Sequence, residues 1–190
     1  MRKLYVTIGL ALCSSSALAA DFGIGISARS DDGFLYVPID VSKTFRIEPT
    51  VRYGTSELSF SEDGSEDSQD TATWEIGVGL FGKKQITDVA HVYYGARLAY
   101  VDTETTAVQP LGFGDVLRSE STQDGYRIGP TLGFEYLFGG HFSIGGEAGY
   151  TFLDLDGEST ARVDDFVLST VETEQKSSAT QTRLIFRYMF

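Results

Sequence analysis

Few side chains in this protein could carry out nucleophilic or metal chemistry. The 190 residues include two histidines, His91 and His141, and one cysteine, Cys13. His141 stands two residues before Ser143, and a histidine can activate a serine hydroxyl for ester hydrolysis when the two side chains meet. Two distant histidines and one cysteine do not supply the ligands of a structural zinc site. We therefore expect no metal and no cofactor.

A second set of chemically active residues consists of charged side chains with a regular spacing. Seven arginines and four glutamates occupy polar positions in runs where polar and apolar residues alternate. If that polar face is enclosed, these charges must pair, because an unpaired buried charge is costly and the planar arginine fork can bridge carboxylates. The predicted network contains Arg29, Arg46, Glu48, Arg52, Glu75, Arg97, Arg127, Glu135, Glu147, Arg183 and Arg187, with Asp40 as a further candidate acceptor.

The alternating runs are the elements that must position these charges. Their period is two rather than 3.6, which indicates β-strands with one apolar face. Each run has roughly ten residues, the length that a tilted strand needs to cross membrane hydrocarbon. Eight such runs cover residues 22–29, 35–42, 45–54, 72–80, 92–100, 126–138, 142–152 and 181–190.

Connections between the runs alternate in length. The first, third, fifth and seventh connections are expected to be a short acidic turn near residue 32 and then three long polar loops, at residues 56–71, 102–124 and 154–178. The connections between them are expected to be short turns, at Lys43 and Thr44, at 82–89, and at Gly139 and Gly140. An up-and-down barrel with both termini on one side produces this asymmetry. The sequence predicts an all-β fold, an eight-stranded antiparallel up-and-down transmembrane β-barrel.

The first nineteen residues have the features of a secretory signal. Arg2 and Lys3 precede an apolar stretch, and Ala17 and Ala19 offer small residues before a cleavage site after Ala19. We expect residues 1–19 to be a signal peptide and 20–190 to be a barrel domain in the bacterial outer membrane. The 171 remaining residues hold 13 basic and 27 acidic side chains, a formal charge of −14, which makes nucleic acid a poor partner.

The composition of the two strand faces predicts which one meets lipid. The polar face is rich in glycine, arginine and glutamate, whereas the four lysines of the mature chain fall in turns, loops or at strand ends. Glycine weakens a solvated strand, but inside a narrow barrel it makes room for guanidinium groups. Aromatic residues of the apolar face gather near both ends of the strands, as expected for belts at the two membrane interfaces. We therefore expect the apolar face to contact lipid.

These features resemble the OmpA and OmpX type of eight-stranded outer-membrane barrel over the whole mature chain. The most specific part of the resemblance is the last strand, which ends in the alternating series Phe186, Tyr188 and Phe190. In that family this strand is the signal read by the outer-membrane assembly machinery, so the resemblance implies the same partner here. Pro38, Pro49 and Pro130 depart from a regular ladder, and bulges or strand ends are expected at them.

Three functions fit such a barrel. The first is a structural or surface-interaction role for a monomer that contacts outer-membrane lipid, lipopolysaccharide or host molecules, and the second is a narrow porin-like pore. The third follows from His141 and Ser143, which resemble the His-x-Ser element of lipid A deacylases. Strand order places His141 at a short periplasmic turn and gives it lumen-facing parity, so the sequence favours a protein that is not an enzyme.

Acidic residues concentrate in two of the expected loops. They are Glu62, Asp63, Glu66, Asp67 and Asp70 in one loop, and Asp154, Asp156, Glu158, Asp164, Asp165, Glu172 and Glu174 in the other. Such runs ordinarily solvate a surface, although carboxylates could also bridge Ca²⁺ or Mg²⁺ to lipopolysaccharide. The apolar residues Phe166, Val167, Leu168 and Val171 could extend a strand above the membrane or contact a partner. The sequence leaves both alternatives open.

Overall fold

Antiparallel strands account for almost all of the described chain. The structure is a computed structural model that describes residues 21–28, 33–62, 65–112, 115–164 and 166–190. Its strands are β1 (Asp21–Ala28), β2 (Gly33–Tyr36), β3 (Ile39–Ser42), β4 (Phe45–Glu62), β5 (Ser65–Thr87), β6 (Ala90–Gly112), β7 (Asp115–Phe138), β8 (Phe142–Val163) and β9 (Phe166–Met189). In these ranges we find no helix with the length and apolar character to cross a membrane. The expected signal peptide, residues 1–19, lies outside the described residues.

The strands form a closed ring of eight. Each strand from β4 to β9 pairs with the next, and β9 pairs with β1 from Leu184 to Met189. Strands β2 and β3 are two halves of one broken strand, because both pair with β1 on one side and with β4 on the other. The predicted eight-stranded up-and-down barrel is confirmed.

The faces of the strands follow the predicted parity. Along β1, Gly23, Gly25 and Ser27 are buried while the intervening apolar residues are exposed. Ile76 and Leu98 are exposed to 42% and 47%, whereas the side chain of Arg97 is only 12% exposed and points into the barrel. A closed barrel whose exterior is apolar and whose interior is charged matches a membrane protein rather than a soluble one.

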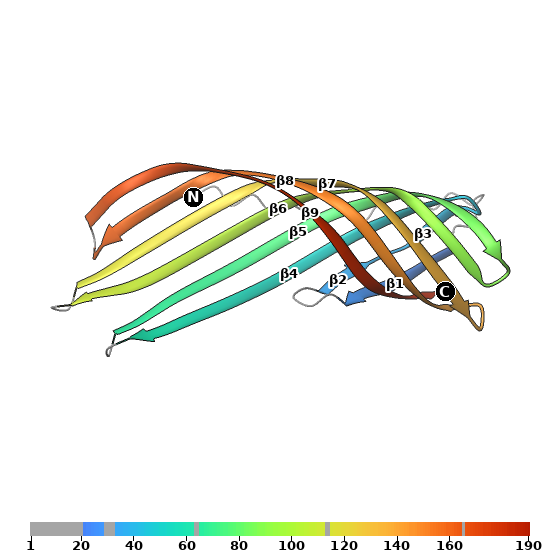
Figure 1. The fold of residues 1–190 in the computed structure, drawn as a ribbon, viewed down its shortest axis with the longest axis horizontal. Helices are drawn as coiled ribbons and strands as arrows, with labels where there is room; N and C mark the ends of the chain where they lie inside the picture. The colour runs from blue at the N-terminus through green and yellow to red at the C-terminus, as the bar shows by residue number, and fades with distance from the viewer. Residues whose placement is uncertain (1–20, 29–32, 63–64, 113–114, 165) are drawn as a thin grey trace.

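Short turns lie at the end of the barrel that holds the chain's C-terminus (Figure 1). Two residues, Lys43 and Thr44, connect β3 to β4. Gly139 and Gly140 turn with positive φ angles of 59° and 84°, a conformation that side chains with a Cβ rarely adopt. The remaining short turn, between β5 and β6, was predicted to span residues 82–89. It is shorter than that, because β5 continues to Thr87 and β6 begins at Ala90.

The prediction of three long loops is wrong. The strands β4 to β9 instead continue as three hairpins far beyond the membrane-facing aromatic residues such as Tyr53, Trp74 and Tyr126 (Figure 1). The extensions are residues 56–62, 65–71, 102–112, 115–124, 154–163 and 166–178. Threonine pairs join neighbouring strands there, with hydroxyl oxygens 3.3 Å apart in Thr71–Thr105 and in Thr73–Thr103. Both faces of these extensions are mainly polar, with exposed apolar side chains toward the hairpin ends such as Phe60, Leu111 and Phe166. The period-two signal therefore disappears although the residues favour strands. We call these extensions the protruding sheet.

The three prolines have different effects on the ladder. Pro38 is buried in the gap between β2 and β3, so the predicted interruption occurs there. Pro49 lies inside β4 opposite Val78, and Pro130 lies inside β7 opposite Ala96. The register does not shift at either position, although the β7–β8 ladder skips Gly129 and Pro130. The expected bulges at Pro49 and Pro130 are therefore not found, because neighbouring pairs keep both strands in place.

Candidate functional site

Arg97 organises the middle of the barrel lumen. Its guanidinium carbon lies 4.9 Å from the ring centroids of both Tyr36 and Phe81. The same group donates a hydrogen bond of 2.9 Å from Nε to Glu147 and one of 2.6 Å from Nη2 to Glu48. Cation–π contacts and charge-assisted hydrogen bonds are strongest where water is excluded. Arg97 therefore joins side chains from four other strands around the ring.

Two further arginines share carboxylates nearer the short turns. Arg187 donates from Nε to Glu48 at 2.9 Å and from Nη1 to Glu135 at 3.2 Å. Both terminal nitrogens of Arg46 donate hydrogen bonds to Glu135, at 2.9 and 3.1 Å, and its Nε donates one to Asp40 at 2.7 Å. Arg46, Arg187, Glu48 and Glu135 thus each meet at least two opposite charges, the arrangement that offsets the cost of removing ions from water.

A third group of charges lies toward the long hairpins. Nη1 of Arg127 is 2.7 Å from Oε2 of Glu75, and Nη1 of Arg52 is 3.5 Å from the same oxygen. Nε of Arg183 lies 3.2 Å from Oε1 of Glu147, which links this group to the central one. The structure thus brings every residue of the predicted network into the lumen except Arg29, which lies outside the described residues.

Lys83 belongs to the same network, and sequence reasoning missed it. Its Nζ donates to Oδ2 of Asp40 at 2.5 Å, and its side chain is only 8% exposed. The expectation that lysines occupy only turns, loops and strand ends is wrong for Lys83 and Lys84, because β5 extends to Thr87, and for Lys176, which lies inside β9. Its odd number matches the inward parity of Phe81, but that parity applies to Lys83 only because β5 continues through it.

Aromatic rings fill much of the space between the charged groups. Tyr93 is fully buried and donates from its hydroxyl to Glu147 at 3.3 Å. A Cβ on Gly133 would lie 2.1 Å from Cζ of Tyr93, and one on Gly79 would lie 2.3 Å from Cε2 of Phe81. At these two positions glycine makes room chiefly for aromatic rings, whereas the sequence predicted room for guanidinium groups.

Little free volume remains in the middle of the lumen. A void of about 20 Å³ lies beside Arg97, Thr50, Thr131 and Thr151, which is space for roughly one water molecule. A larger hollow of about 660 Å³ opens at the short-turn end and is lined by Lys83, among other residues. The ion pairs and rings described above separate the two spaces.

His141 and Ser143 do not form a catalytic pair. Nδ1 of His141 lies 3.0 Å from the backbone oxygen of Met189, and its ring stacks on Tyr188 with centroids 5.9 Å apart. Ser143 faces the lumen and is 2% exposed. The histidine lies at the short-turn end, so it contacts β9 rather than activating the serine.

Two aromatic belts mark the membrane-facing surface. Near the long hairpins, the rings of Tyr53 and Trp74 lie 4.5 Å apart, and those of Tyr100 and Tyr126 lie 5.7 Å apart. Near the short turns the exposed rings are Phe22, Phe45, Tyr136, Phe138, Phe142, Tyr188 and Phe190. Exposed aliphatic side chains fill the zone between the belts: Ile24, Ile26, Ile76, Leu80, Leu98, Ile128, Leu132 and Leu184. An exposed apolar band of this kind requires lipid.

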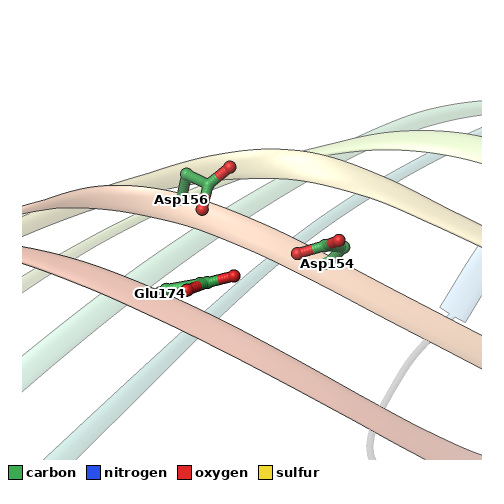
Figure 2. A group of neighbouring side chains, drawn as sticks. All are labelled: Asp154, Asp156 and Glu174. Carbon is green, nitrogen blue, oxygen red and sulfur yellow. The ribbon is translucent and has the colours of Figure 1, made fainter.

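Carboxylates gather on the outer face of the protruding sheet, just beyond the aromatic belt. The strand registers place Asp102, Asp124, Asp156 and Glu174 in one row across β6, β7, β8 and β9. Oxygens of Asp154, Asp156 and Glu174 lie within 4.8 Å of one another (Figure 2), and Lys176 forms an ion pair with Glu174. All three carboxylates are exposed, as acidic groups on a solvated surface commonly are. The side chains of residues 62–66 lie outside the described part.

Comparison with solved structures finds similar proteins from other bacteria. The major outer membrane protein of Thermus thermophilus matches with a TM-score of 0.69 and 13% identity, covering 90% of this chain and 100% of that one. CarO2 of Acinetobacter baumannii has a TM-score of 0.49 and 8% identity, covering 90% and 98%. Ail, the attachment invasion locus protein of Yersinia pestis, has a TM-score of 0.44 and 10% identity, covering 90% and 95%.

The sequence itself matches no protein-family model and no curated protein. The assignment therefore rests on structure: the closed ring of eight strands, the charged lumen, the apolar band with its two belts, and the likeness to the Thermus protein. Together they identify this chain as an eight-stranded outer-membrane β-barrel.

Proposed function

We propose that this barrel is a surface-interaction protein whose membrane part is a structural anchor. The observation that carries the proposal is the protruding sheet, which extends β4 to β9 to lengths of 18 to 24 residues. About ten residues suffice to cross the hydrocarbon. The remaining length holds a large polar surface outside the membrane, where it can meet lipopolysaccharide or host molecules.

The state of the lumen supports an anchor rather than a pore. The side chains of Arg46, Arg187, Glu48, Tyr93 and Phe81 are almost completely buried and fill the ring. An eight-stranded barrel has an interior just wide enough to be filled by side chains. We expect the protein to give no single-channel steps in planar lipid bilayers. Steady steps that vanish on Arg97→Ala or Glu135→Ala would show a pore instead.

A trimmed barrel tests the surface role. The trimmed barrel has three new two-residue turns, each of which joins residues that lie opposite each other on neighbouring strands: Thr55 to Ala72, Thr103 to Gln123, and Gly157 to Thr173. These joins remove most of the protruding sheet and preserve the ring. We expect bacteria that display the full barrel to stay on serum-coated glass at least several-fold better than bacteria that display the trimmed one. Heat-modifiable migration in gels controls for folding of both proteins. Equal retention would contradict the proposal.

The C-terminal strand remains the predicted assembly signal. The backbone nitrogen of Phe190 donates to the oxygen of Phe22 at 2.9 Å, so the last residue helps to close the ring. Tyr188 and Phe190 are exposed on the lipid side, where an assembly partner could contact them.

A further inference from the structure

The small void in the middle of the lumen is surrounded by more positive than negative side chains. Its volume is about 20 Å³, and its lining includes the guanidinium groups of Arg97, Arg127 and Arg183 but only one carboxylate, that of Glu75. These four side chains come from β6, β7, β9 and β5, so the void lies inside the ring rather than between two neighbouring strands. A cavity of this size has room for one particle of about the size of a water molecule.

Small residues on the inner face create this space. Ala99 and Gly149 line the void, and Gly77 lies opposite Ala99 on the neighbouring strand. A Cβ on Gly149 would lie 3.3 Å from Oγ1 of Thr131, and one on Gly77 would lie 2.8 Å from Oγ1 of Thr50. Larger side chains at these inward positions would therefore crowd the threonine hydroxyls and close the void, as in most protein interiors.

Three threonines bring hydroxyl groups to the lining. The hydroxyl of Thr151 donates to the backbone oxygen of Ala179 at 3.2 Å. Thr50 and Thr131 are also buried, but their hydroxyls form no hydrogen bond with any other residue that the structure describes. A buried hydroxyl without a partner is costly, so an occupant that accepts hydrogen bonds from Thr50 and Thr131 stabilises the barrel.

Arg97 has an unused donor as well. Its Nε and Nη2 donate to Glu147 and Glu48, but its Nη1 is buried and has no hydrogen-bond partner among the described residues. In folded proteins a buried polar atom of this kind is commonly explained by a bound water or ion. The lining of the void thus offers several donors that the protein itself does not use.

The charges of the lining distinguish between possible occupants. The carboxylate of Glu75 already accepts a hydrogen bond from Arg127 at 2.7 Å, and Arg97 and Arg183 share the carboxylate of Glu147. A cation would be repelled by the three guanidinium groups, whereas an anion would be attracted to them where little water is present to screen the charges. Phosphate and sulfate are too large for a space that holds one water, so the lining fits a monatomic anion.

We propose that the void binds one chloride ion as a structural ligand of the barrel. The hydroxyls of Thr50 and Thr131 donate hydrogen bonds to the ion. The guanidinium groups of Arg97, Arg127 and Arg183 balance its charge. Because these five residues belong to β4, β6, β7 and β9, the ion links strands across the lumen. The site does not depend on the surface role proposed above.

The first test locates the ion. Bromide substitutes for chloride in protein sites and scatters X-rays anomalously, so the full barrel is refolded and crystallised in sodium bromide. We expect one anomalous peak between Thr50 and Thr131 in the wild type. The double variant Thr50→Val with Thr131→Val keeps the shape of both side chains but removes both hydroxyl donors, and we expect it to lose the peak.

A second test measures binding in solution. An anion that binds only the folded barrel raises the free energy of unfolding as its concentration rises. Urea titrations in lipid vesicles compare sodium chloride with sodium gluconate at equal ionic strength, because gluconate screens charges equally but is too large for the void. We expect chloride to stabilise the wild type, and the double variant to bind chloride at least about tenfold more weakly.

Ser27→Ala is the matched control. Oγ of Ser27 is also buried without a hydrogen-bond partner among the described residues, but Ser27 does not belong to the lining of the void. This variant should keep both the bromide peak and the chloride dependence of the wild type. Heat-modifiable migration in gels confirms that each variant folds, and the wild-type measurements decide the question even if the double variant does not.

Three results would overturn the inference. Wild-type crystals without a bromide peak in the void would show that it holds water, and so would equal stability in chloride and gluconate. A folded double variant with the chloride dependence of the wild type would place the anion elsewhere. None of these results bears on the surface role, which the trimmed barrel tests separately.

Discussion

The barrel interior and the protruding sheet share the six long strands β4 to β9, but charged side chains are buried and paired in the first and exposed in the second. In the interior, Glu48 is fully buried between Arg97 and Arg187, at 2.6 and 2.7 Å. In the sheet, Glu120 also faces two arginines, but all three side chains are at least 40% exposed. The interior holds charges that must stay paired, whereas the sheet holds charges that remain free to meet other molecules.

The backbone shows the same contrast. Inside the membrane the ring is closed, because no water is present there to bind a free N–H or C=O group. Beyond the outer belt the short strands β1 and β2 have ended, and the six longer strands continue as an open sheet (Figure 1). Free edges are tolerated there because water can bind their N–H and C=O groups.

The largest expected effect comes from removing one charge in the interior. Glu48→Gln leaves Arg97 and Arg187 each with one carboxylate fewer, and breaking a buried ion pair costs about 3–5 kcal/mol. We expect the free energy of unfolding to fall by that amount in urea titrations followed by the fluorescence of Trp74.

The matched control lies in the sheet. Glu120→Gln removes a glutamate that also has two arginine partners, Arg118 at 2.9 Å and Arg162 at 3.9 Å. Because exposed ion pairs contribute about 0–1 kcal/mol, the change should be near the limit of measurement. Similar losses for Glu48→Gln and Glu120→Gln would mean that burial does not distinguish the two regions.

A smaller effect is expected from a charge placed on the lipid side. Leu132 lies midway along the membrane part of β7 and is 57% exposed to lipid. Leu132→Arg should lower the free energy of unfolding by about 2–4 kcal/mol, because an arginine at the bilayer midplane is poorly solvated. Thr122→Arg, on the same face of the same strand but in the protruding sheet, should change it little. Refolding titrations into lipid vesicles measure both, and an equal cost would move the membrane boundary beyond Thr122.

How far the sequence predicts the fold depends on whether a strand separates two environments. Within the membrane, one face meets lipid and the other a charged lumen, so residues such as Ile76 and Glu75 alternate and the ring of eight could be predicted. In the protruding sheet both faces meet water, and segments such as 102–112 show no alternation. Their threonine-rich composition favours strands, but a polar segment without periodicity looks like a loop.

The sequence predicts which residues face the lumen, but it does not predict which of their side chains form ion pairs. Parity identifies Arg97, Glu48 and Glu147 as inward-facing, yet which arginine meets which carboxylate depends on the tilt and register of the strands around the ring. The aromatic partners Tyr36 and Tyr93 share that inward parity and could have been included. Lys83 could not be placed without knowing that β5 continues through it.

The smallest expected effect concerns the acidic row of the protruding sheet. Burial, together with the neighbouring carboxylates Glu104 and Asp124, raises the pKa of Asp102 above its ordinary value of 3.8. A carboxyl group whose pKa is raised on folding destabilises the fold when it is charged, so the penalty is present at neutral pH and disappears as the pH falls through the raised pKa. We expect Asp102→Asn to increase the free energy of unfolding at pH 7 by about 0.5 kcal/mol or less.

Glu174 lies in the same row as Asp102, but its pKa is shifted in the opposite direction. Its hydrogen bond and charge interaction with Lys176 lower the pKa of Glu174, so its contribution is present at neutral pH and is lost as the pH falls through the lowered pKa. Urea titrations at pH 7 and at about pH 3 should show the advantage of Asp102→Asn disappearing on acidification, where the wild-type carboxyl is also uncharged. Glu174→Gln should show no such advantage at pH 7. If Asp102→Asn were destabilising at neutral pH, the Asp102 carboxylate would have a favourable partner, and its pKa would not be raised in the way that burial and the neighbouring carboxylates indicate.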